Sequence, residues 1–86
     1  MEGTDALEFE RLARAYAQGE VGWADVHKWA IEMEWRGTAQ QVPRILEDLY
    51  FVFLTADELD DPQFHRTRTE ISAMIQDVDE ARLREG

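Results

Sequence analysis

The chain has no cysteine, only two prolines and no long apolar run. Without cysteine, disulfide bonds, thiolate catalysis and cysteine zinc sites are excluded, so the core has to be stable without disulfide crosslinks or cysteine-bound zinc. No apolar stretch approaches the roughly 20 residues that a membrane-spanning helix needs. Residues 1–5 lack the basic and apolar regions of a secretory signal. We therefore expect a cytoplasmic protein.

Basic residues are also few, and this scarcity sets the charge. Nine arginines and lysines face nineteen aspartates and glutamates, which gives a net charge of −10. Such a chain repels phosphate backbones and anionic membranes and attracts basic proteins. The alternative is that the acidity only keeps a small protein soluble.

The length of 86 residues corresponds to one domain, residues 1–86. A domain this short buries only roughly 60–65% of the surface that its unfolded chain exposes. The hydrophobic fraction of 44% is that of a folded globule. The chain can therefore form one modest core, with little room for a deep internal active site.

Turn residues divide the chain into four segments with helical periodicity, at about residues 5–18, 23–36, 43–57 and 62–84. Gly19 and Gly37 fit the position after a helix end, where a left-handed backbone favours glycine. Pro43 fits a first helical position, and Asp61 followed by Pro62 fits an N-cap and first position.

Each segment carries apolar residues at helical spacing, which predicts a face turned toward the core. The run from Leu49 to Leu54 could form a strand by local propensity. No second strand-like segment is available to pair with it, so we favour a helix. Short connections then predict an all-α fold, an antiparallel four-helix bundle with up-down-up-down topology. The predicted core positions are Phe9, Leu12, Ala13, Tyr16, Trp23, Val26, Trp29, Ala30, Ile31, Met33, Ile45, Leu46, Leu49, Tyr50, Phe53, Phe64, Ile71, Met74, Ile75 and Val78, with Leu83 extending the last face.

No catalytic, cofactor or metal motif is found. His27 and His65 lie in different segments with no motif around either, and no glycine-rich phosphate loop is present. The acidic run at residues 57–61 lacks the ligand spacing and the glycine of a calcium loop. Two carboxylates could serve acid–base chemistry only in a cleft, which a domain of this size rarely offers. We predict a binding protein with no cofactor and no metal, not an enzyme.

The acidic residues are concentrated in one stretch. From Arg44 to Gln63 there are six acids and one base, together with Tyr50, Phe51 and Phe53, some of which we expect beside the acids at the surface. Acidic charge steers a basic partner, and buried aromatic side chains supply affinity. In the alternative, these aromatics all lie in the core and the acids only solvate the surface. The predicted partner-binding acids are Glu47, Asp48, Asp57, Glu58, Asp60 and Asp61.

The three tryptophans cannot share one face of a helix. Trp23, Trp29 and Trp35 are six residues apart, and a step of six residues turns by about 240° net. Trp35 lies near a helix end and is the residue we expect at the surface, as a partner contact or a dimer interface. In the alternative it packs over the end of the bundle.

Two stretches resemble a known family. The first is Leu12-Ala13-Arg14-Ala15-Tyr16-Ala17-Gln18-Gly19-Glu20-Val21, followed by Trp23 and Val26; the second is Ile45-Leu46-Glu47-Asp48-Leu49-Tyr50-Phe51, leading to Asp57-Glu58-Leu59. In pattern and order they resemble the colicin D immunity protein family, the self-protective colicin-like immunity proteins. The closely spaced tryptophans depart from that pattern.

The resemblance implies a four-helix bundle that binds the cationic nuclease domain of a toxin. Such an inhibitor occludes the site for tRNA and presents carboxylates where phosphates would lie, at the six acids named above. We thus predict an immunity or antitoxin-type toxin inhibitor that contacts neither nucleic acid nor membrane directly. The alternative is a homo-oligomeric or adaptor bundle that binds another protein, or a second copy, through an exposed aromatic patch.

Overall fold

The computed structural model describes residues 4–55 and 67–85, and these residues form helices with no strand among them. The helices are α1 (Thr4–Ala17), α2 (Trp23–Arg36), α3 (Glu47–Thr55) and α4 (Arg68–Glu85), with the short 3₁₀ helices η1 (Ala39–Gln41) and η2 (Arg44–Leu46) between α2 and α3. The all-α prediction is confirmed. The ambiguous run at residues 49–54 is helical, as predicted.

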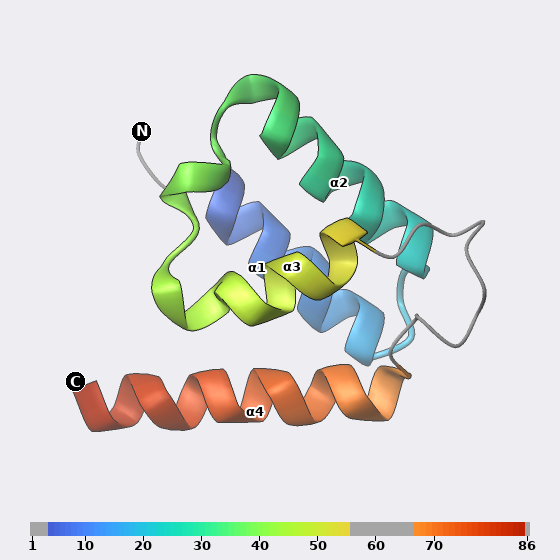
Figure 1. Ribbon diagram of the computed structural model, residues 1–86. Helices are drawn as coiled ribbons and strands as arrows, with labels where there is room; N and C mark the ends of the chain where they lie inside the picture. The colour runs from blue at the N-terminus through green and yellow to red at the C-terminus, as the bar shows by residue number, and fades with distance from the viewer. Residues whose placement is uncertain (1–3, 56–66, 86) are drawn as a thin grey trace.

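The helices alternate in direction along the chain (Figure 1). α1 packs against α2 and α4, α2 packs against α3, and α3 meets α4. α4 lies along the lower edge of the view, and the C-terminal end of α2 lies at the opposite, upper side. The result is the antiparallel four-helix arrangement that the periodicity predicts.

Two glycines end α1 and α2. Gly19 has φ of 84° and Gly37 has φ of 74°, both in the left-handed region. After each glycine the chain turns back on the helix: the Glu20 N–H donates to the Ala15 carbonyl at 2.9 Å, and the Thr38 N–H donates to the Met33 carbonyl at 2.9 Å. These bonds satisfy carbonyls of the last helical turn.

The start of α4 differs from the predicted boundary. A capping box precedes Arg68: the Glu70 N–H donates to the Thr67 hydroxyl at 3.1 Å, and the Thr67 N–H donates to the Glu70 carboxylate at 3.4 Å. The predicted cap, Asp61 with Pro62, lies outside the described residues, as do Phe64 and His65. Pro43 precedes η2 rather than opening α3, and the Leu46 N–H donates to its carbonyl at 2.8 Å.

The core is built around aromatic rings from three helices. The fully buried Phe53 of α3 has its ring centroid 4.3 Å from Trp23, 5.6 Å from Tyr16 and 6.0 Å from Phe9. Tyr50 meets Phe9 edge to face at 5.2 Å. The buried core residues are Ala6, Phe9, Ala13, Tyr16, Trp23, Val26, Ala30, Met33, Val42, Leu46, Leu49, Tyr50, Phe53, Ile71, Ile75 and Val78.

Within residues 4–55 and 67–85, one predicted core residue is wrong. Leu83 is 81% exposed, because the buried stripe of α4 runs through Ile71, Ile75 and Val78, and its next position is 82 rather than 83. Among the other predicted core residues, Leu12, Trp29, Ile45 and Met74 are half-buried and pack against the core, and Ile31 is half-buried.

Polar contacts fasten α3 to α2. The Tyr50 hydroxyl donates a hydrogen bond that is shared between two acceptors. The Ala30 carbonyl and the Glu34 carboxylate each lie 3.0 Å from it. Burial, reinforced by Glu34, raises the pKa of this phenol. The His27 Nδ1–H donates to the Phe53 carbonyl at 2.7 Å. His27 is therefore a structural side chain that caps a carbonyl of α3.

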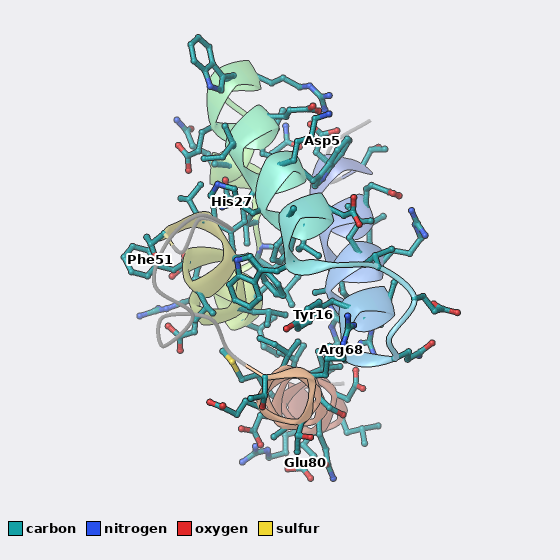
Figure 2. The ribbon with its side chains drawn as sticks, turned by 90° about the vertical axis from the view of Figure 1, so that its right-hand side faces the viewer. Asp5, Tyr16, His27, Phe51, Arg68 and Glu80 are labelled. Atoms are coloured by element: carbon teal, nitrogen blue, oxygen red, sulfur yellow. The ribbon has the colours of Figure 1, made fainter. Side chains whose placement is uncertain are left out.

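Arginines fasten α4 to α1. Arg68 donates to the Tyr16 carbonyl and, at 3.0 Å, to the Val21 carbonyl, and its guanidinium lies 4.4 Å from the Tyr16 ring centroid. Figure 2 shows these two labelled side chains meeting between α1 and α4. Further along, Arg14 pairs with Glu10 at 2.8 Å and with Asp79 at 2.7 Å, and Arg82 pairs with Glu10 at 2.6 Å.

We expect Phe53→Ala to destabilise the fold by about 3–5 kcal/mol, because it leaves a cavity under three aromatic rings. Urea unfolding followed by circular dichroism measures this loss. Phe51→Ala is the matched control, since Phe51 lies two positions away on α3 and is 64% exposed. A similar loss for both variants would contradict the central role of Phe53.

We expect Glu10→Gln to lower the free energy of unfolding at pH 7 by about 1 kcal/mol, since solvent partly screens its two arginine partners. The hydrogen bond from Arg82, opposed by partial burial and reinforced by Arg14, lowers the pKa of Glu10 below its ordinary 4.5. A lowered folded pKa gives stability that is complete above 4.5 and is lost as the pH falls through the folded value. The difference in unfolding free energy between the wild type and the variant should therefore become smaller below pH 4.5. Glu8→Gln, which breaks only an exposed pair with Arg11, should show a much smaller gap at pH 7.

Candidate functional site

A groove of about 150 Å³ runs between α3 and α4. Three residues from each side line it: Ile45, Asp48 and Leu49 from η2 and α3, and Met74, Asp77 and Val78 from α4. Leu49 and Val78 are buried, Ile45 and Met74 are half-buried, and both aspartates are exposed. The groove thus has an apolar floor with a carboxylate on each wall.

The same spacing builds both walls. Each side offers an apolar residue, then an aspartate three positions later and an apolar residue four positions later, Ile45-x-x-Asp48-Leu49 and Met74-x-x-Asp77-Val78. Residues at these spacings share one face of a helix. Because α3 and α4 belong to one antiparallel packing arrangement, the two faces meet and bring Asp48 and Asp77 to the same groove.

The groove carboxylates are not neutralised by the described part of the chain. The ion pairs of residues 4–55 and 67–85 lie within α1 and α2 and at their seams with each other and with α4. Asp48 and Asp77 take part in none of them. Arg44, the base that precedes Asp48 by one turn, is exposed and does not line the groove. The arginines therefore neutralise the α1 side and leave the α3–α4 side negative.

An exposed aromatic ring stands beside these acids. Phe51 projects from α3 into solvent (Figure 2) and is 64% exposed. It follows Glu47 and Asp48 by about one helical turn, so it shares their side of α3. Tyr50 and Phe53 are buried. The prediction that some of these aromatics adjoin the acids therefore holds for Phe51 alone.

The predicted partner-binding acids fall into two sets. Glu47 and Asp48 lie in the first turn of α3 and are exposed. Asp57, Glu58, Asp60 and Asp61 lie outside the described residues.

Asp77 and Met74 were not predicted as site residues. Asp77 is far from Asp48 in the sequence, and the helical spacing predicts Met74 only as a core residue. The recurring apolar-x-x-Asp-apolar pattern was the one sign that linked the two helices.

Trp35 lies at the C-terminal end of α2 and is 86% exposed. The prediction that it lies at the surface is confirmed, and the alternative that it packs over the bundle end is wrong. Trp23 is buried, and Trp29 is half-buried with its Nε1–H donating to the Asp5 carbonyl at 3.0 Å. The C-terminal end of α2, which carries Trp35, and α4, which forms one wall of the groove, lie at opposite sides of the molecule (Figure 1).

The groove lining combines four apolar side chains with two carboxylates. None of its six residues carries a hydroxyl, thiol or imidazole group that could act as a nucleophile. Within the described residues, no three or more metal-ligating side chains are grouped to hold an ion. Carboxylates above an apolar floor are suited to a partner that is both cationic and apolar.

Within residues 4–55 and 67–85, none of the helices combines the length and the hydropathy needed to cross a membrane. No family model, curated protein or solved structure matches this chain. The resemblance to the colicin D immunity proteins therefore stays a prediction.

Proposed function

We propose that this protein is a binding protein, not an enzyme, and that it captures a basic protein partner on the surface formed by α3 and α4. The observation that carries the proposal is the groove itself, where Asp48 and Asp77 from two helices share an apolar floor and form no ion pair within the described residues. Uncompensated carboxylates attract and orient a cationic surface. The apolar floor and the exposed Phe51 supply apolar surface that is buried from water on binding.

The partner that fits best is the nucleic-acid-binding surface of a toxin nuclease. Such a surface is basic because it holds phosphates. A protein with net charge −10 can occupy it with carboxylates and so exclude the nucleic acid, without itself touching nucleic acid or membrane. The acidic stretch between Arg44 and Gln63 and the resemblance to colicin D immunity proteins both support an immunity or antitoxin-type inhibitor. Because tRNA is the substrate that the resemblance suggests, we place this inhibitor in the cytoplasm.

We expect Asp48→Lys/Asp77→Lys to weaken binding to a basic toxin encoded next to this chain by at least about 100-fold, since two favourable charge contacts become repulsive. Titration calorimetry measures the affinity, and protection of tRNA from cleavage measures inhibition. Glu20→Lys/Glu80→Lys makes the same change in net charge at exposed positions outside the groove. Glu80 points away from the other helices (Figure 2).

The control variant should lose only a few-fold in affinity, and raised salt should slow association of the wild type because it screens steering. Equal losses in the two reversed variants would show that net charge alone matters. Full binding by the groove variant would remove the α3–α4 surface from the proposal.

A second candidate is favoured by one observation, the 86% exposure of Trp35. An indole at a helix end is a suitable anchor for a homodimer or for an adaptor contact. Under the inhibitor proposal, Trp35→Ala leaves toxin binding unchanged and the protein alone sediments as a monomer in both low and high salt. A salt-resistant dimer that Trp35→Ala dissociates would favour the second candidate.

A further inference from the structure

The groove between α3 and α4 has the size of a receptor for one side chain. A cavity of about 150 Å³ holds a ligand of roughly the size of benzene, and the groove has this volume. A partner helix or strand is too large to enter it. Whatever enters therefore does so as a single side chain from a partner that rests on the rim.

The lining determines the chemistry of that side chain. Its deep part meets Leu49 and Val78, which are buried, and the half-buried Ile45 and Met74. These four residues favour an aliphatic stem, because packing there removes apolar surface from water. The exposed carboxylates of Asp48 and Asp77 favour a cation near the mouth. Lysine and arginine are the side chains that join an aliphatic stem to a charged head.

The remaining charges near the groove do not supply this cation. Arg44 is exposed one turn before Asp48 and does not line the groove, while Glu47 beside it adds negative charge. The arginines of the α1–α4 seam, Arg14 and Arg82, are engaged with Glu10 and Asp79. A cation that enters the groove meets two carboxylates without a basic partner among the described residues, and each carboxylate attracts it.

We propose that the α3–α4 groove is a receptor for one long cationic side chain, arginine or lysine, of the protein partner. This inference rests on the proposed function and specifies how the partner is recognised. The stem packs on Ile45 and Met74, and the head lies between Asp48 and Asp77. Arginine is favoured over lysine, because its planar guanidinium can donate to both carboxylates at once.

The test uses the full ¹⁵N-labelled chain and small probes followed by NMR. N-acetyl-arginine amide and N-acetyl-lysine amide supply both the stem and the charge. N-acetyl-citrulline amide keeps the shape of arginine without its charge, and the guanidinium ion keeps the charge without the stem. We expect saturable shifts confined to residues 45–49 and 74–78 with the arginine and lysine probes, arginine binding more tightly. Citrulline should give no such shifts, and guanidinium should bind at least about 10-fold more weakly.

Three variants separate the carboxylates from the groove. Asp48→Asn/Asp77→Asn should weaken the arginine probe at least about 10-fold, whereas Glu20→Gln/Glu80→Gln, with the same change in net charge, should leave its affinity within two-fold. Met74→Phe fills the groove without changing charge, and it should weaken the probe several-fold while the amide spectrum stays that of a folded chain. If Met74→Phe disturbs the fold, the comparison of guanidinium with arginine amide decides the same point.

Failure of this inference differs from failure of the proposed function. Shifts spread over acids around the whole surface, or guanidinium as effective as arginine amide, would overturn side-chain insertion, and toxin capture by the α3–α4 surface would then depend on the charge-reversal result alone. Specific arginine binding with no effect of Asp48→Lys/Asp77→Lys on toxin capture would support the receptor and reject the inhibitor.

Discussion

The packing of Phe53 is the interaction on which the rest of the structure depends. α3 has only nine residues, which is too short for a helix to be stable alone in water. Its position is set by the Phe53 ring against Phe9, Tyr16 and Trp23, with the Tyr50 hydroxyl and His27 holding polar ends in place. α3 also carries Asp48, which lines the groove. The fully buried ring of Phe53 therefore fixes the position of one wall of the groove.

The second constraint is the placement of the few basic residues. The chain has nineteen acids and nine bases. The surface is therefore negative wherever no basic side chain pairs with the acids. Arg14 and Arg82 are bound to Glu10 and Asp79, Arg36 to Asp5 and Glu32, and Arg68 to backbone carbonyls. All of these contacts involve α1, α2 or the turn between them. Within the described residues, these contacts thus leave Asp48 of α3 and Asp77 of α4 without a basic partner.

Local features of the sequence predicted the fold well, and pairings across the sequence accounted for the errors. The left-handed glycines at 19 and 37, the helix over 49–54 and the exposed Trp35 all follow from neighbouring residues and periodicity. The capping box at Thr67 was equally local and was missed because the Asp-Pro pair upstream was a more conspicuous signal. Asp77 could not be assigned to the site, because its relation to Asp48 exists only once α3 and α4 have packed.

The groove lies between α3 and α4, a seam that no ion pair of the described residues joins. α4 is fastened to α1 by Arg68 and by the Glu10, Arg14, Asp79 and Arg82 network. Asp48 and Asp77, by contrast, form no ion pair within the described chain, so their charges do not join α3 to α4. Both carboxylates line the groove and are exposed, so their charge is accessible from outside. A cation from a partner would supply the counter-charge that the described residues do not, which is the condition that the proposed function requires.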